Sequence, residues 1–295
     1  MSLDLADVET IYAEDPKLKR ENVKSLTEWV EQQPHLPEIT ELQVILFLHS
    51  CYYDMEAAKT TIENYFTVRT NSDLFHCATE EVIRRTLSVA FIHLLPKKTP
   101  EGDVVLFMKL LDRRSEKYIN LEHIKVATML MSLYFHQHGP ANGMIAVFDM
   151  EGATLGHLAR ISLSGSKQLL YFVQEALMTR IKSIHHINIV PMTEPMVALI
   201  RPFLKKEIYK MLKFHHSYDS FYESIPKECL PKEYGGDLPA LATLHEENIK
   251  NLMDNLDFFK WHDNQKVDES KRVGQSQNKK SFFSLTGSFK KLELD

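Results

Sequence analysis

Asp149 and Glu151 stand two residues apart at the end of an apolar run, a spacing at which paired carboxylates can act as general acid and general base. A reaction centre would also need a nucleophile, a base or a metal ligand close by. No cluster of these groups accompanies the two acids across residues 143–239. The carboxylates alone do not define a reaction centre, and we expect no catalytic residues.

The histidines include three close pairs, at positions 136/138, 185/186 and 215/216. Adjacent residues of a strand point to opposite faces, so one metal ion cannot bind both members of a neighbouring pair. No pair shows the full ligand spacing of a zinc site. The three cysteines (Cys51, Cys77 and Cys229) are widely spaced and form neither a metal motif nor a disulfide framework. We expect no metal, and reduced thiols in a cytosolic compartment.

Other sequence signals exclude further classes of function. There is no GxGxxG after a strand, no P-loop and no G-x-S-x-G elbow, although Ser-Gly-Ser occurs at 164–166. The net charge of −5 lacks the basic excess of a nucleic-acid binder. The N-terminal segment is too polar for a signal peptide, and no apolar run reaches the ~18 residues of a membrane span. We expect a soluble, cytoplasmic protein that meets membranes only peripherally.

Helix signals dominate the first third of the chain. Apolar residues at 23, 26 and 30 recur at helical spacing, which predicts a helix over 4–33. Two more helices are predicted over 40–66, followed by a polar loop over 67–75. Residues 1–89 are therefore predicted to form a small helical N-terminal annex.

From residue 90 onward, strand and helix signals alternate, which predicts an α/β domain over 90–260 with a mostly parallel sheet covered by helices. The predicted strands are 104–111, 144–150 and 181–189, and the main predicted helices are 121–137, 167–178, 202–213 and 240–260. The segment 261–295 is a polar C-terminal tail, expected to be disordered or loosely docked. Its phenylalanines (Phe282, Phe283 and Phe289) either fold back on the domain or form a short partner motif.

Four phrases in a fixed order carry a resemblance to a known family. They are GMIAVFDMEG (143–152), IHHIN (184–188), IRPFLKKEI (200–208) and LPKEYGGDLP (230–239). Their order and wording resemble the CRAL-TRIO lipid-binding family, in particular its α-tocopherol transfer protein-like and cellular retinaldehyde-binding protein-like members. The resemblance extends loosely over residues 15–260, and it implies that Asp149 and Glu151 have structural roles.

The resemblance also implies an internal apolar pocket for a hydrophobic ligand. Alternation along the strand sends Met144, Ala146 and Phe148 to one face, and by resemblance this is the ligand face. The full set of expected pocket residues is Ala127, Leu130, Met144, Ala146, Phe148, Leu169, Phe172, Val173 and Leu177. A closed core without a cavity would use the same residues, so the pattern leaves both alternatives open.

The predicted helix 202–213 is amphipathic, and the resemblance implies that it is a gate helix closing the pocket. Its predicted apolar face consists of Leu204, Ile208, Met211 and Leu212. Its basic side consists of Lys205, Lys206, Lys210 and Lys213, opposed only by Glu207. Apolar burial and attraction to anionic lipid would then act together at a membrane surface.

A second basic group, formed by Arg180, Lys182 and Arg201, is implied by resemblance to belong to a phosphoinositide-binding cleft, because convergent arginines and lysines suit phosphate groups. The chain departs from the family at several basic positions. Two positions that are basic in the family's gate helix are Glu207 and Met211 in this sequence. The family phrase FLRARKFD is FLHSCYYD at 47–54, where His49 and Cys51 replace two basic residues. Unspecific attraction to anionic membranes therefore remains an alternative.

The sequence predicts a non-enzymatic, monomeric carrier without a cofactor. Its cargo would be a hydrophobic small molecule such as a tocopherol, retinoid or carotenoid, released at anionic membranes. No nucleic-acid partner is expected. The alternative is a membrane-adaptor module that binds phosphoinositides and transfers no cargo.

Overall fold

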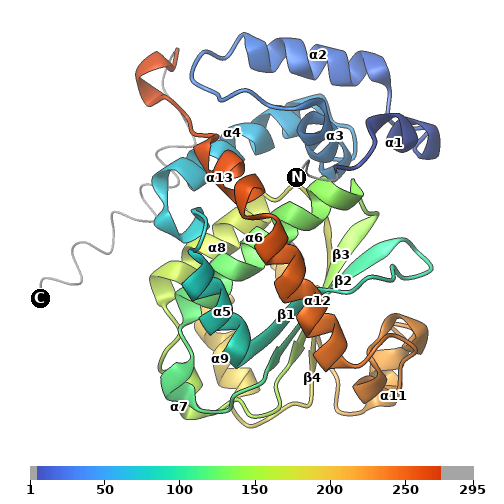
Figure 1. Ribbon diagram of the computed structural model, residues 1–295, viewed down its shortest axis with the longest axis vertical. Coiled ribbons are helices and arrows are strands. Elements are labelled where there is room, and N and C mark those ends of the chain that lie inside the picture. The colour runs from blue at the N-terminus through green and yellow to red at the C-terminus, as the bar shows by residue number, and fades with distance from the viewer. Residues whose placement is uncertain (1–4, 274–295) are drawn as a thin grey trace, which may run out of the picture.

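The computed structural model describes residues 5–273 and contains a five-stranded sheet between helical layers (Figure 1). The tail phenylalanines lie outside the described residues. The strand order is β1-β2-β3-β4-β5; β1 is antiparallel to β2, and all other neighbours are parallel. The predicted α/β class with a mostly parallel, helix-covered sheet is confirmed. The strands are Ala90–Leu94, Asp103–Leu110, Gly143–Asp149, Ile181–Ile187 and Leu212–Phe214.

The two edge strands, β1 and β5, were not predicted. Helix α5 (Glu80–Val89) passes into β1 without a loop, because Ala90 already adopts extended backbone angles. No turn signal therefore separates the two elements. Strand β5 has only three residues, and its extended conformation depends on pairing with β4, which lies far away in the sequence.

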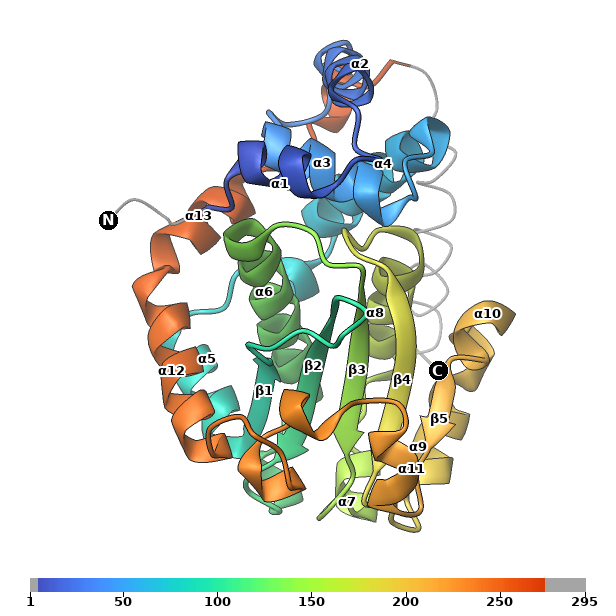
Figure 2. The same cartoon turned by 90° about the vertical axis from the view of Figure 1, so that its right-hand side faces the viewer.

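Alternation along the strands divides the hydrophobic residues between the two faces of the sheet. Met144 packs in the cluster formed with α6 (Asn120–His138) and α8 (Leu163–Glu175). Ile145 and Val147 pack in a second cluster with α11 (Tyr218–Tyr222) and the start of α12 (Leu241–Asp254). Figure 2 shows α6 and α8 behind the strands and the segment after α11 crossing in front.

The N-terminal annex differs from the prediction in two places. The expected helix over 4–33 is two helices, because the chain turns at Asp15 and Pro16. The expected loop over 67–75 is helical to Asn71, because the polar Arg69 is buried against another helix. The annex helices are α1 (Val8–Glu14), α2 (Arg20–Glu31), α3 (Glu41–Ser50), α4 (Met55–Asn71) and α5.

The annex and the sheet domain share one hydrophobic core. Phe172 of α8 stacks on Phe75 at 4.6 Å between ring centroids and lies 5.7 Å from the ring of Tyr65. Helix α13 (Leu256–Asn264) adds a bond from Tyr65 to His262, and Gln265 bonds to Gln43 at 2.8 Å. The residues that follow α12 therefore pack across α3 and α4.

The buried carboxylate of Asp149 joins three of the four phrases at the carboxyl edge of the sheet. It accepts hydrogen bonds from Lys109 Nζ at 2.7 Å, Tyr234 Oη at 2.6 Å and Asn188 Nδ2 at 2.9 Å, and from the N–H of Glu151. Burial raises the pKa of Asp149, but these bonds together outweigh it and hold the pKa below its ordinary value. The acid is therefore charged and fully bonded.

The last phrase needs its two glycines for geometric reasons. Gly235 has φ +68°, a left-handed conformation that ends the short 3₁₀ turn Lys232–Tyr234. A Cβ at Gly236 would lie 1.9 Å from the carbonyl oxygen of Leu230. The loop thus places Tyr234 against Asp149.

Asp149→Ala should lower the free energy of unfolding by about 3–5 kcal/mol, because it leaves the Lys109 cation and two polar groups without their buried partner. Urea unfolding followed by fluorescence measures this loss. Glu151→Ala is the matched control, because Glu151 binds the same lysine but its side chain is 46% exposed. Glu151→Ala should lower the free energy of unfolding by less than about 1 kcal/mol. Equal losses in the two variants would contradict the assigned role of Asp149.

Candidate functional site

The register of the sheet places ten side chains in two rows on the face toward α6 and α8, since paired neighbours share a face. The first row is Leu94, Leu106, Ala146, Ile184 and Leu212. The second row is Ile92, Met108, Phe148, His186 and Phe214. These rows cross the region where the sequence predicts the pocket.

Burial along the first row falls from β1 to β5. Leu94 and Leu106 are 3% and 4% exposed, whereas Ile184 and Leu212 are half-buried and Phe214 is 39% exposed. The second row does not follow this trend, since Met108 and Phe148 are half-buried and His186 is 7% exposed. Over β4 and β5, the partly exposed side chains are Ile184, Leu212 and Phe214. Apolar side chains in this half of the sheet remain partly accessible to solvent.

The expected pocket residues fall into two groups. Four are buried in the main core, Leu130, Met144, Phe172 and Leu177, and Ala146 is also buried. The remaining four keep partial exposure: Ala127, Phe148, Leu169 and Val173. Of these, Phe148 lies in the second row, between Met108 and His186.

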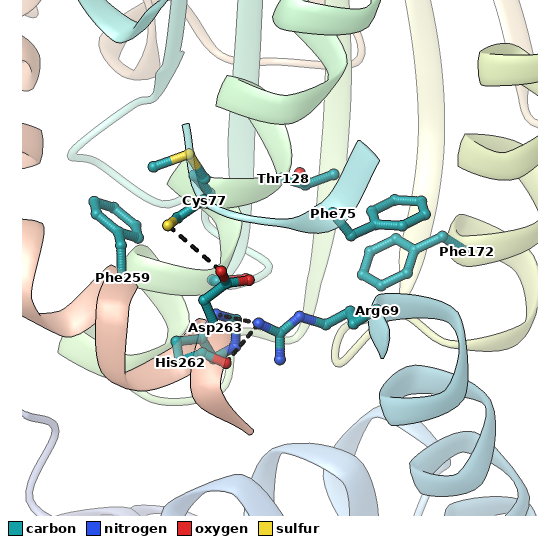
Figure 3. A pocket seen from close by; sticks show the side chains of 10 residues that line it. Arg69, Phe75, Cys77, Thr128, Phe172, Phe259, His262 and Asp263 are labelled. Carbon is teal, nitrogen blue, oxygen red and sulfur yellow. Dashed lines mark hydrogen bonds between the residues drawn. The ribbon is translucent and has the colours of Figure 1, made fainter. Parts of the chain in front are cut away.

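A small cavity lies where Phe172 meets the annex (Figure 3). It encloses about 10 Å³, about the space that one water molecule needs. Arg69 Nη2 donates to Nδ1 and the carbonyl of His262, while Arg69 Nη1 is buried without a partner. Asp263 accepts from Cys77 on the other side. This polar junction holds α4 against α13 and is too small for a lipid.

A second hollow, of about 240 Å³, lies at the carboxyl ends of β4 and β5. Its lining includes Asn188 and the exposed side chains of His216, Ser217 and Tyr218. This polar rim does not suit a hydrophobic ligand.

The predicted gate helix over 202–213 is wrong as a single helix. The segment forms a 3₁₀ turn (Arg201–Phe203), a short helix α10 (Lys206–Tyr209) and strand β5. The chain is extended at Leu204 and Lys205, where Gln174 accepts from the N–H of Lys205 at 2.6 Å. Residues 212–214 pair with the open edge of β4. These non-local partners override the helical periodicity.

The helix before this segment is α9 (Thr193–Ile200), and together they form what we call the gate segment, residues 193–214. Gln174 Nε2 also donates to the carbonyl of Phe203 at 3.2 Å, and Lys205 forms an ion pair with Glu175. The end of α8 therefore holds the gate segment in place through three polar contacts.

The apolar face and the basic side predicted for the gate helix still differ in exposure, although the segment is not one helix. The four expected apolar residues are half-buried: Leu204, Ile208, Met211 and Leu212. The four lysines are exposed: Lys205, Lys206, Lys210 and Lys213. The segment therefore presents a basic outer surface and a less polar inner one.

The other basic residues are divided between two places. Arg180 donates to the carbonyl of His49, and its guanidinium lies 3.8 Å from the ring centroid of Tyr52. Burial, followed by the charges of Arg180 and Lys182, lowers the pKa of His49 to about 4 despite an opposing contribution from Asp15. Arg180 and Lys182 thus lie beside the annex. Arg201 instead stacks on Tyr209 within the gate segment, at 4.8 Å.

A chain of four side chains that sequence reasoning missed connects β4 to β5 and α11. Ser220 donates to the carbonyl of Ser217 and so accepts from His215 Nδ1 at 3.0 Å. His215 Nε2 then accepts from His185 Nδ1 at 2.8 Å, and His185 Nε2 accepts from Ser183 at 2.7 Å. Both imidazoles are neutral in this arrangement. The adjacent-histidine signal pointed to these residues without indicating that they pair across strands.

Comparison with known protein families gives two matches along the chain. Residues 90–236 match the model of the CRAL/TRIO domain, and residues 15–78 match that of the Pinta-like UBA domain. The fold and the CRAL/TRIO match define the class: the chain belongs to the CRAL-TRIO family.

The chain is 25% identical over 235 residues to the human alpha-tocopherol transfer protein-like protein, covering 78% of this chain and 69% of that protein. It is 23% identical over 235 residues to human Clavesin-2, covering 77% and 71%. The crystal structure of Sfh5 aligns over 82% of this chain and 99% of that chain, with a TM-score of 0.46 and 11% identity, a similarity too weak to support an inference.

Two absences hold for residues 5–273. None of the helices in this range is long and apolar enough to cross a membrane. Within the same residues, histidines, cysteines and acids nowhere gather in threes in a way that could hold a metal ion.

The Ser–His–His–Ser chain should make stability depend on pH. Burial, then the neighbouring His215, Lys213 and His186, lowers the pKa of His185 to about 3, whereas an unfolded histidine titrates near 6.5. Between these values the unfolded state binds more protons, so the free energy of unfolding falls as pH falls.

His185→Leu should flatten this slope by up to one proton, about 1.4 kcal/mol per pH unit, between pH 4 and pH 6. Urea unfolding at several pH values measures the slope. Phe221→Leu, which disturbs packing on the same histidines without removing a titrating group, should lower stability with the slope unchanged. An unchanged slope in the His185 variant would refute the assignment.

Proposed function

We propose that this protein is a non-enzymatic carrier that binds a hydrophobic small molecule over the β4–β5 half of the sheet and releases it at membranes. No cofactor is part of the proposal, because the cargo itself is the bound group. The observation that carries the proposal is the partial exposure of the apolar side chains Ile184, Leu212 and Phe214 on β4 and β5. Membership of the CRAL-TRIO family, whose similar members include a protein named for tocopherol transfer, supports the same function.

Removal of the partly exposed apolar surface from water supplies the driving force for cargo binding. Each Å² of apolar surface removed from water contributes about 25 cal/mol, and each buried CH₂ group about 0.8 kcal/mol. A cargo of ~20 carbons would cover the accessible faces of residues such as Ile184 and Leu212, giving micromolar to nanomolar affinity after ordering costs. Without cargo, this apolar surface would stay in contact with water.

Residues 193–211, the part of the gate segment that precedes β5, would move to admit cargo, while β5 stays paired with β4. The connection of this part to α8 depends on Gln174 and Glu175, and net contributions of such hydrogen bonds and partly exposed ion pairs are about 1 kcal/mol each. Opening therefore breaks a few weak contacts and leaves the Asp149 network intact. A membrane could offset this cost by binding the lysines on the outer surface.

Phosphoinositide headgroups are the anionic lipids that we propose for this contact, on the cytoplasmic side of a membrane. Lys206, Lys210 and Lys213 are exposed on the gate segment, where they can reach phosphate groups. Arg180 is already bonded to the annex, so the gate lysines supply most of the accessible charge.

Native mass spectrometry of the purified protein, before and after incubation with lipid-loaded liposomes, tests the carrier function. We expect one hydrophobic molecule bound per chain and its transfer to acceptor liposomes. Headgroup-selective membrane binding without extraction of any lipid would contradict the carrier and identify a membrane adaptor instead.

Replacing Lys206, Lys210 and Lys213 together by Ala should weaken binding to anionic liposomes by about 3 kcal/mol, roughly a hundredfold, because each lysine near such a surface contributes about 1 kcal/mol. Liposome co-sedimentation measures the loss, and high salt should reduce it. The matched control is the triple Lys→Arg variant, which keeps the charge and should bind normally. Transfer to anionic liposomes at the unmodified rate by the Ala variant would refute the role of the gate lysines.

A further inference from the structure

The two histidines of the IHHIN phrase point to opposite faces of β4. His185 lies on the face toward α11, within 6.1 Å of the Phe221 ring. His186 lies on the face toward α8, between two parallel aromatic rings. Its ring is 5.3 Å from Phe148 at 12° and 4.9 Å from Phe214 at 16°. His186 therefore belongs to the second row, on the face of the sheet where we place the cargo.

His186 is a buried polar group with an unmet hydrogen-bonding capacity. The residue is 7% exposed, and its Nδ1 is buried with no hydrogen-bond partner. Burial lowers its pKa to about 4, although a hydrogen bond with the backbone of Lys213 acts in the opposite direction. The ring is therefore neutral near pH 7. Seven other histidines of the described residues also bury a ring nitrogen without a partner, and His186 differs from them in lying in the two rows over which we place the cargo.

Packing alone does not explain a histidine at this position. A phenylalanine would complete the same three-ring stack and leave no nitrogen without a partner. Of the ten side chains in the two rows, His186 is the only polar one, and none is charged at neutral pH. Pockets for hydrophobic ligands commonly combine apolar walls with a few polar groups that fix the orientation of the ligand.

We propose that His186 Nδ1 is the polar anchor of the cargo site and hydrogen-bonds to a single hydroxyl group at one end of a hydrocarbon ligand. A hydroxyl group fits because it both donates and accepts, and so matches Nδ1 in either neutral tautomer. The hydrocarbon body would lie along Ile184 and Leu212. This proposal rests on the carrier function, and it narrows the cargo to hydrophobic alcohols and phenols, as distinct from pure hydrocarbons and ionised fatty acids.

The test uses matched pairs of probes that differ only in the hydroxyl group. The full-length protein is incubated with liposomes containing phytanol with phytane, and cholestanol with cholestane, at equal mole fractions. Bound molecules are counted by native mass spectrometry. We expect the unmodified protein to take up the alcohol of at least one pair about tenfold more than its hydrocarbon, the effect of one buried hydrogen bond.

His186→Phe keeps the aromatic stack and removes only the nitrogens, so it should take up alcohol and hydrocarbon equally. His216→Phe, the same change at an exposed histidine, should keep the tenfold preference. Equal uptake by the unmodified protein, or a preference retained in His186→Phe, would overturn the anchor and leave the carrier function standing. Uptake of no lipid at all by the unmodified protein would instead refute the carrier function and, with it, the anchor.

A second measurement on the unmodified protein covers the case in which His186→Phe does not fold. The ¹⁵N resonance of His186 Nδ1 should shift when the protein is loaded with the preferred alcohol and stay in place with the paired hydrocarbon. No shift with an alcohol that is demonstrably bound would overturn the proposal.

Discussion

The buried charge of Asp149 is the constraint on which the arrangement of the sheet depends. A carboxylate with a fully buried side chain is tolerated only when every lone pair finds a donor. Its donors come from β2, from the turn after β3, from the residue after β4 and from the loop 230–239. Satisfying one side chain therefore fixes four segments relative to one another. Tyr234 adds packing to this network, since its ring lies 4.7 Å from that of Phe107.

The fixed carboxyl edge contrasts with the half of the sheet under the gate segment. Over β1 to β3 the sheet is covered by α6 and joined to the annex through Phe172, Phe75 and Tyr65. Over β4 and β5 the cover consists of short elements held by a few polar contacts with the end of α8. Local stability follows the number of buried apolar contacts, so we propose that residues 193–211 of the gate segment open while β5 and the remainder stay folded.

Strand β4 serves both halves because adjacent residues face opposite ways. His185 is used in a closed hydrogen-bond chain that joins β4 to β5 and α11. His186 faces the other side and keeps an unpaired nitrogen. The first histidine has all its partners within the protein, and we propose that the second takes a partner from the cargo. One dipeptide thus contributes both to the fixed structure and to the proposed selectivity for cargo.

The sequence by itself determined the α/β class, the central strands β2 to β4, and the face to which Met144, Ala146 and Phe148 point. These features depend on local periodicity and on alternation, which are properties of neighbouring residues. The four ordered phrases also indicated the family. Tertiary structure alone decided that residues 202–213 are not one helix, because Gln174 and the edge of β4 offer partners that no local pattern contains. It also decided that Arg69 is helical and buried, that Phe172 faces the annex, and that His185 bonds to His215. Each of these depends on residues distant in sequence, whose proximity exists only once the sheet and its helices have packed.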